Sequence, residues 1–249
     1  MNIEKLVDTV VKAGTMLIES GAEIYRVEET MVRICKSYPE VEIADSFVTA
    51  TGIMMSVMID GKTTTRIARV RSKDVDMHVI DQINSLSRQV CQDCMDVDEL
   101  SAQLDWIANE KRYSFWTTAL FGAIGAAGFA LLFQGSIQEI FASFLVGFMI
   151  RLLMEVLSHF RLNTFLVNLV MAAFTVMMIV FLRGFFSHYC IDVVTISSIM
   201  LLVPGLAITN AIRDTIAGDY LSGLARSTEA ILVAIAIAMG VGFSMRIFL

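Results

Sequence analysis

Residues 162–182 read LNTFLVNLVMAAFTVMMIVFL, an apolar run without a single charged side chain. A helix rises 1.5 Å per residue, so about 20 such residues cross the hydrocarbon core of a bilayer, which is roughly 30 Å thick. This run therefore predicts a transmembrane helix.

Four further apolar runs accompany it. They cover residues 113–133, 140–157, 193–212 and 229–248. The whole chain has 249 residues, of which 56% are hydrophobic and 18% are charged, and its mean hydropathy is +0.67. This composition is too apolar for a soluble domain. The sequence predicts an α-helical polytopic membrane protein with about five transmembrane helices.

The charged residues are concentrated in the N-terminal part of the chain. Residues 1–112 hold 13 Lys and Arg against 19 Asp and Glu, whereas residues 113–249 hold six of each kind. We therefore expect a cytoplasmic domain over 1–112 and a transmembrane domain over 113–249. The net negative charge of the first domain, without a cluster of Lys or Arg, argues against a nucleic-acid-binding protein.

The N-terminal domain has the patterns of an α+β fold. Apolar residues at helical spacing predict helices over 3–20, 22–37, 74–90 and 96–110. Runs rich in Val, Ile, Thr and Met predict strands over 41–50, 52–59 and 63–70, with a hairpin turn at Asp60-Gly61.

Lys and Arg near the ends of the spans indicate the orientation, because cytoplasmic loops carry an excess of these residues. One side has Lys111, Arg112, Arg161, Arg213 and Arg226, and the other has Arg183 and Arg246. We therefore expect a multi-pass protein of the inner membrane, with the N-terminus in the cytoplasm and the C-terminus outside.

Cys91 and Cys94 form the one cysteine pair with a metal-like spacing. A zinc site needs about four ligands, and the sequence contains no second pair. We expect neither a metal nor another cofactor. The sequence also lacks a nucleophile-and-base pattern and a glycine-rich phosphate loop, which argues against an enzyme.

The stretch GAEIYRVEETM, residues 21–31, is unusually rich in charge. Its charged residues are Glu23, Arg26, Glu28 and Glu29. Arg26 follows Glu23 by three positions, so one interpretation is a solvated helix face that pairs with itself. The other interpretation is a polar contact with the membrane half of the chain or with a ligand.

Charges also interrupt the run 140–157. Arg151 and Glu155 stand at positions i and i+4, and His159 follows one turn later. Such charges are costly inside a bilayer, so they are paired or functional. Either they form an internal ion pair that faces neighbouring helices, or Arg151 binds an anionic substrate group while Glu155 or His159 handles a proton.

The stretch LLVPGLAITNAIRDTIAGDYLSG, residues 201–223, combines a helix break with charges. Pro204 removes a backbone donor and Gly205 frees the backbone, so we expect the run 193–212 to break near its middle. The half-helix N-terminus that results favours a carboxylate, and transporters use such breaks at their substrate sites. The alternative is a proline kink followed by an amphipathic helix in a cytoplasmic loop.

These patterns give two sets of candidate site residues. Substrate binding is assigned to Pro204, Gly205, Asn210, Arg213, Arg151 and Asn168. Proton coupling or gating is assigned to Asp214, Asp219, Glu155, Glu229 and Arg226. The charged residues of 21–31 form a third, cytoplasmic candidate group.

Three segments together resemble the threonine/serine exporter family, and specifically its N-terminal, YjjP-like half. They are GAEIYRVEETM at 21–31, VTATGI at 48–53 and VPGLAITNAIRDTIAGDYLSGLARSTEA at 203–230. The resemblance implies a cytoplasmic domain followed by about five spans. It also implies export driven by the proton-motive force, of threonine and serine by full-length members or of succinate by split members.

Full-length members carry a second bundle of about four or five spans, whereas this sequence stops at Leu249. The resemblance therefore implies a separate small membrane subunit as partner, and it leaves both the substrate and transport by this chain alone open. We expect a subunit of a secondary exporter of small carboxylate metabolites. The alternative is a membrane-anchored metabolite sensor or enzyme whose cytoplasmic domain is active, although an anchor needs neither five spans nor a broken helix.

Overall fold

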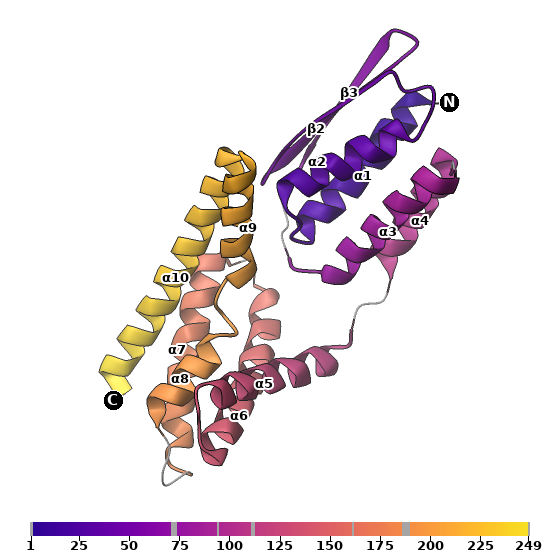
Figure 1. The fold of residues 1–249 in the computed structure, drawn as a ribbon. Helices are drawn as coiled ribbons and strands as arrows, with labels where there is room; N and C mark the ends of the chain where they lie inside the picture. Colours follow the sequence, from indigo (N-terminus) through magenta and orange to yellow (C-terminus); the bar gives the residue numbers. More distant parts are fainter. Residues whose placement is uncertain are drawn as a thin grey trace. The chain divides into compact units, whose positions relative to one another are not determined.

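The computed structural model describes residues 2–70, 74–93, 95–110, 113–160, 162–185 and 190–248. The chain divides into two compact units, whose elements are labelled in Figure 1. The first unit consists of Met1–Lys111 and Leu206–Thr228, and the second of Arg112–Gly205 and Glu229–Leu249. The stretch 206–228 thus packs with the N-terminal part of the chain, whereas the charge distribution assigned it to the membrane domain.

A three-stranded antiparallel sheet forms one layer of the first unit. Its strands are β1 (Ile43–Thr49), β2 (Gly52–Ile59) and β3 (Lys62–Arg69), in the order β1-β2-β3. Asp60 and Gly61, with φ angles of 50° and 70°, make the turn between β2 and β3. A two-residue hairpin turn with both φ angles positive matches the twist of its strands, so the hairpin predicted from Asp60-Gly61 is confirmed.

Four helices of the first unit cover one face of the sheet in two further layers. They are α1 (Ile3–Glu19), α2 (Ile24–Lys36), α3 (Met77–Asp93) and α4 (Val97–Asn109). Helices α1 and α2 pack on the sheet, and α3 and α4 pack on the far side of α1 and α2 (Figure 1). Apolar residues at the predicted helical spacing, such as Leu6 and Val10 of α1, are fully buried in this core.

The first unit also contains α9 (Gly205–Ala217) from Leu206 onward and the first turns of α10 (Tyr220–Phe248). Gly218, with a φ angle of 99°, makes the turn between these two helices. A Cβ atom at Gly223 would lie 2.1 Å from Thr215 Oγ1 and 3.0 Å from the carbonyl oxygen of Ala211. Glycine at position 223 therefore lets α9 and α10 approach closely.

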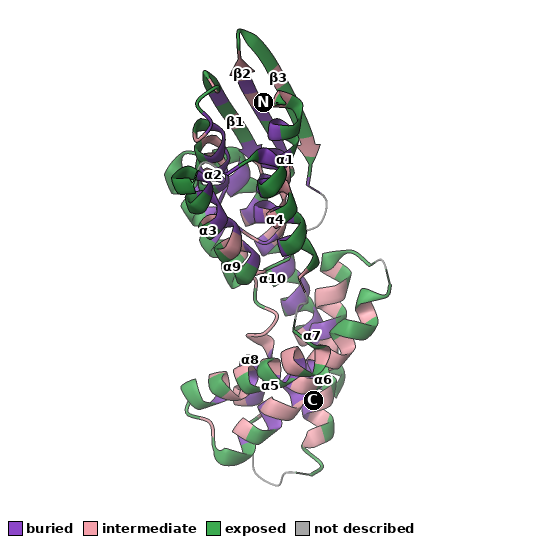
Figure 2. Ribbon diagram, turned by 90° about the vertical axis from the view of Figure 1, so that its right-hand side faces the viewer, coloured by how far each residue is buried: buried purple, intermediate pink, exposed green. Residues whose placement is uncertain are grey.

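The second unit is a bundle of helices. It contains α5 (Phe115–Leu132), α6 (Ile137–Ser158), α7 (Thr164–Leu182), α8 (Ile191–Ile199) and the part of α10 from Glu229 onward. Among the described residues, the four helices α5, α6, α7 and α10 are long and apolar enough to cross a membrane, with mean hydropathies of 1.7 to 2.6. Figure 2 shows α5 to α8 mostly half-buried or exposed, as expected of helices that face lipid.

The predicted span 193–212 is not one helix. Helix α8 ends at Ile199 and α9 begins at Gly205, directly after Pro204, so the predicted break in this run is confirmed. The nine residues of α8 are about 14 Å long, too short for the hydrocarbon core. By length and hydropathy the described helices give four candidate spans, and the run 193–212 is divided between α8 and α9.

Small residues let α5 and α6 pack closely in the second unit. A Cβ atom at Gly147 would lie 2.7 Å from the Cβ atom of Ala126 and 3.2 Å from the Cα atom of Ala123. Close approach of small residues replaces the hydrophobic drive that lipid-embedded helices lack.

Candidate functional site

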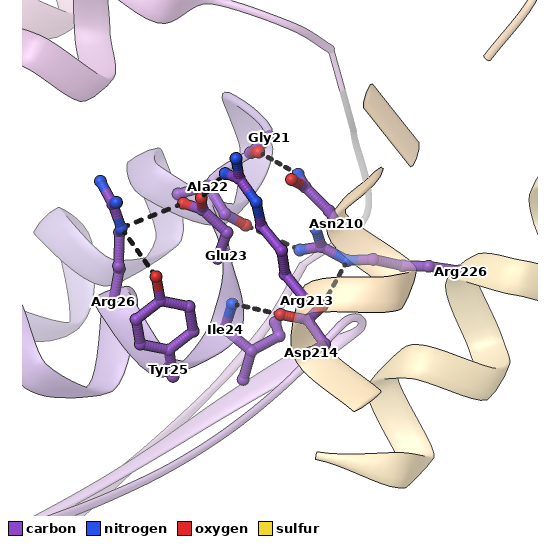
Figure 3. A network of polar contacts seen from close by, with 10 residues as sticks. All are labelled: Gly21, Ala22, Glu23, Ile24, Tyr25, Arg26, Asn210, Arg213, Asp214 and Arg226. Atoms are coloured by element: carbon purple, nitrogen blue, oxygen red, sulfur yellow. Dashed lines mark hydrogen bonds and ion pairs between the residues drawn. The ribbon is translucent and has the colours of Figure 1, made fainter. Parts of the chain in front are cut away.

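A polar network joins α9 and α10 to the turn between α1 and α2, all within the first unit (Figure 3). Asp214 Oδ1 accepts a hydrogen bond of 3.1 Å from the backbone N–H of Ile24, and Asp214 Oδ2 lies 3.3 Å from Arg226 Nε. Arg226 in turn donates a hydrogen bond of 2.8 Å to the carbonyl oxygen of Ala22. The side chain of Asp214 is completely buried and that of Arg226 is nearly so, which makes this a buried ion pair.

Two more side chains of α9 complete the network. Asn210 Nδ2 donates a hydrogen bond of 2.8 Å to the carbonyl oxygen of Gly21. Arg213 Nη1 donates a hydrogen bond of 2.5 Å to Glu23 Oε1. We call these four side chains of α9 and α10, with residues 21–24, the turn network. Every residue of the turn is thus held by a different polar contact.

The start of α2 explains why an acidic residue binds there. Glu23 is the N-cap residue of α2, but its side chain caps no backbone N–H group. The first N–H groups of a helix have no partner within the helix, and the helix dipole makes this end partly positive. Asp214 supplies the missing acceptor to Ile24, so the helix N-terminus and Arg226 both stabilise its negative charge.

The pKa values of the two acidic residues of the turn network are shifted in opposite directions. Burial raises the pKa of Asp214 above its usual value, with help from the nearby charges of Asp219 and Glu23 and against the effects of Arg226 and the Ile24 N–H. Burial also disfavours the Glu23 carboxylate, but hydrogen bonds from its own backbone N–H and from Arg213 outweigh it and lower the pKa of Glu23. The surroundings thus favour the protonated form of Asp214 and the ionised form of Glu23.

A second acidic pair lies beside the network. Burial raises the pKa of Glu28, and the negative charge of Asp219 adds to this effect, although the backbone N–H of Val48 donates a hydrogen bond of 2.8 Å to Glu28 Oε1. Asp219 acts in the same direction on both Glu28 and Asp214. The charge of Asp219 therefore affects the proton affinities of both Glu28 and Asp214.

The charged residues of the stretch 21–31 make two different kinds of contact. Glu23 contacts Arg213 of α9, a polar contact beyond the stretch itself, but α9 belongs here to the same compact unit and not to the membrane unit that one interpretation named. Self-pairing also occurs, because Arg26 Nε lies 3.5 Å from Glu23 Oε2 and Glu29 pairs with Arg33. Arg26 and Glu29 stay largely exposed, whereas Glu23 is buried.

Arg151, Glu155 and Asn168 lie in the second unit and form no part of the turn network. The expected internal ion pair is wrong for the residues that the structure describes, because Arg151 Nη1 contacts the sulfur of Met154 and the Glu155 side chain is exposed. Only the backbone oxygen of Glu155 meets His159, at 2.8 Å. Asn168 donates to the carbonyl oxygen of Thr164 in its own helix.

The remaining candidates are distributed between the units. Gly205 is the first residue of α9 and Pro204 precedes it, and both belong to the second unit, as does Glu229 in α10. Among the described residues, no group of three or more His, Cys, Asp or Glu side chains could hold a metal ion. Cys94, one half of the predicted cysteine pair, lies outside the described residues.

One buried acidic residue was missed from the sequence. Glu139 accepts hydrogen bonds of 2.6 Å from the backbone N–H groups of both Ser136 and Cys190, so it ties the start of α6 to the start of α8. It was missed because the predicted span began at residue 140. The signal was present, since Ser136 and Glu139 have the Ser-x-x-Glu spacing of a capping box, which the structure contains.

The comparisons with known proteins agree along the length of the chain. The family model described as "Putative threonine/serine exporter" matches residues 8–248. The chain is 25% identical to the "Probable succinate transporter subunit YjjP" of Escherichia coli, over 96% of this chain and 93% of that protein. It is 20% identical to the "Probable threonine/serine exporter" of Mycobacterium tuberculosis, over 99% of this chain and 47% of that protein.

A third relative is "Pheromone-regulated membrane protein 10" of Saccharomyces cerevisiae, which is 25% identical over 93% of this chain and 30% of that protein. The chain thus spans nearly all of the Escherichia coli relative, about half of the mycobacterial one and about a third of the yeast one. No solved structure matches.

Proposed function

The chain belongs to the threonine/serine exporter family, and from this premise we propose that it is a subunit of a secondary exporter driven by the proton-motive force. Its cargo is a small carboxylate metabolite, either threonine and serine or a dicarboxylate such as succinate. Relatives named for each class support this range. A second small membrane subunit completes the exporter, in line with the subunit named in Escherichia coli and the longer mycobacterial relative.

The observation that carries the coupling proposal is the complete burial of Asp214 in the turn network. While the network is closed, burial raises the pKa of Asp214, whereas opening would expose the carboxyl group to water and return its pKa to the usual value. Closing therefore raises the affinity of Asp214 for a proton, and opening lowers it. The positive charge of Arg226 stabilises the ionised form of Asp214 in the closed state, and the negative charge of Asp219 raises the proton affinity of Asp214.

The route from this network to the membrane runs through two helices. Helix α9 begins at the Pro204-Gly205 break, and α10 runs as one helix from Tyr220 to Phe248. Opening of the network changes the contacts of both helices, so it can alter the binding of substrate at the break. Arg213, whose side chain is about half exposed, is the network residue best able to bind a substrate carboxylate.

The other assigned residues have secondary roles in this proposal. Asn210 and Asn168 supply uncharged hydrogen-bonding groups, Arg151 supplies a positive charge in the second unit, and Glu155 and Glu229 are further carriers of a proton. The N-terminal unit faces the cytoplasm of a cell with an inner membrane, in accordance with the excess of Lys and Arg on that side.

The test is efflux of preloaded labelled serine, threonine and succinate from cells that lack their own exporters. The cells carry this chain alone, the second subunit alone, or both, each with and without an uncoupler. We expect uncoupler-sensitive efflux of one substrate class only when both are present. Efflux of none of the three substrates, with both proteins in the membrane, contradicts the proposal and would favour a sensor whose N-terminal unit binds a metabolite.

A further inference from the structure

The face of α9 opposite the turn network is apolar and exposed. Ile208, Ile212 and Ile216 follow one another at four-residue intervals, and Ile216 is 81% exposed. Ile212 and Ile216 each stand two residues after a buried network residue, Asn210 and Asp214, which places them about 200° around the helix. The helix therefore turns one face to the network and presents an apolar stripe on the other.

The start of α10 continues this apolar surface. Tyr220, Leu221 and Leu224 are all exposed, Leu221 by 75%, whereas Gly223 lies against α9 and Arg226 joins the turn network. We name Ile208, Ile212, Ile216, Tyr220, Leu221 and Leu224 the hairpin face. Single exposed apolar residues are ordinary on proteins, but a group of six on two consecutive helices marks an interaction site.

Lipid is a poor occupant for this face. Arg213 is 54% exposed and lies only about 60° around α9 from Ile216, so lipid contact would bring a charged guanidinium against hydrocarbon. Helices that lie on a membrane surface carry an excess of Lys and Arg, whereas α9 has one Arg and one Asp. A protein surface with an apolar centre and a polar rim can satisfy both the isoleucines and Arg213.

The longer relatives indicate which protein could bind to the hairpin face. This chain spans 47% of the mycobacterial exporter, so the remaining half of that protein has no counterpart in this sequence. We infer that the hairpin face docks a second membrane subunit equivalent to that remaining half. The inference rests on the proposed function, because it assigns a surface to the partner proposed there. Tyr220 has the chemistry that interface anchors favour.

The test uses the full-length chain, tagged and produced together with the second subunit, defined as the membrane protein whose sequence matches the other half of the mycobacterial exporter. The variants Ile216→Asp and Leu221→Asp each place a charge on the hairpin face. Both side chains are largely exposed, so their replacement should hardly affect the stability of the fold. Ile67→Asp is the matched control, because Ile67 is 69% exposed on the outer face of the sheet. Recovery of the second subunit per tagged chain is measured after purification in detergent.

We expect at least tenfold less second subunit with each hairpin-face variant and a change below twofold with Ile67→Asp. The reason is that a carboxylate buried without a partner in an interface is strongly unfavourable. Equal recovery with Ile216→Asp and Ile67→Asp overturns the docking surface while leaving the proposed function intact. A reduced amount of Ile216→Asp in the membrane, with unchanged second subunit per chain, would assign the face to lipid and also overturn it. If the unaltered chain retains no second subunit, both the surface and the subunit proposal fail.

Discussion

Replacement of Arg226 by Gln tests the buried ion pair of the turn network. The variant leaves Asp214 completely buried without its positive partner and removes the donor to the carbonyl oxygen of Ala22. Loss of one member of a buried pair costs about 3–5 kcal/mol. Asp214 can escape part of this cost by binding a proton, which at pH 7 costs about 4 kcal/mol for a carboxyl group of ordinary pKa.

The closed network should therefore lose about 2–4 kcal/mol, since Gln can still donate a neutral hydrogen bond worth about 1 kcal/mol. At 1.4 kcal/mol per factor of ten, opening becomes about 30 to 700 times more frequent. The assay is hydrogen–deuterium exchange of the amides of residues 21–27, because the N–H of Ile24 is itself bonded to Asp214.

The effect has a defined dependence on pH. A carboxyl group whose pKa is raised in the closed state destabilises that state increasingly as pH rises toward the raised pKa, and acidification removes the penalty. Exchange in Arg226→Gln, expressed relative to the unaltered protein at each pH, should slow by up to tenfold per unit of acidification. The double variant Asp214→Asn/Arg226→Gln should show no such dependence. Asp98→Asn, which alters an exposed pair with Lys5, is the control.

Exchange of residues 21–27 in Arg226→Gln within threefold of the unaltered protein would refute the reasoning. So would an increased exchange that acid does not reverse, because the cost would then not arise from the charge of Asp214.

Three further substitutions test the packing and the exposed contacts. Gly223→Ala places a Cβ atom 2.1 Å from Thr215 Oγ1, so α9 and α10 must separate at a cost of about 1–3 kcal/mol, seen as faster amide exchange throughout α9; unchanged exchange would contradict the close approach. Gly147→Ala forces α5 and α6 apart at a similar cost, and a melting temperature in detergent equal to that of the unaltered protein would contradict it. Glu23→Gln should speed exchange in the turn by less than about fivefold, because its partner Arg213 is half exposed. Ionised Glu23 stabilises the closed network fully above about pH 4.5, and this stabilisation disappears as pH falls through the lowered pKa of Glu23. The exchange rates of Glu23→Gln and of the unaltered protein should therefore become equal in acid. A difference in exchange that persists there would be inconsistent with an ionic contact.

Local patterns predicted the helices, the hairpin and the helix break, because each depends on neighbours in the sequence. Pro204 at the break and Asp60-Gly61 at the hairpin act through their own backbone conformations. The same reasoning found Asp214 and Arg226 as polar residues in an apolar region, but not their partners. Those partners are a backbone N–H and a backbone carbonyl about 200 residues away in sequence, and backbone groups carry no residue signature.

The ion pair expected from the i, i+4 spacing of Arg151 and Glu155 was wrong for a related reason. This spacing allows an ion pair on one helix face, but the packing of the bundle decides whether it forms. Gly122 makes room beside the Arg151 stem, where a Cβ atom would lie 2.8 Å from Arg151 Cγ. The side chain packs against α5 there, while Glu155 remains exposed.

Proton coupling through Asp214 is the central claim, and transport in vesicles that contain both subunits tests it most directly. The measurement is the initial rate of movement of labelled serine, threonine and succinate with and without an imposed pH gradient, for the unaltered chain and for Asp214→Asn. We predict that the gradient accelerates movement of one substrate class by the unaltered chain and has no effect on the variant, whose residue 214 cannot exchange a proton. Equal acceleration by the gradient in both proteins would contradict the assignment of the proton to Asp214, and no acceleration in the unaltered chain would contradict proton-driven export itself.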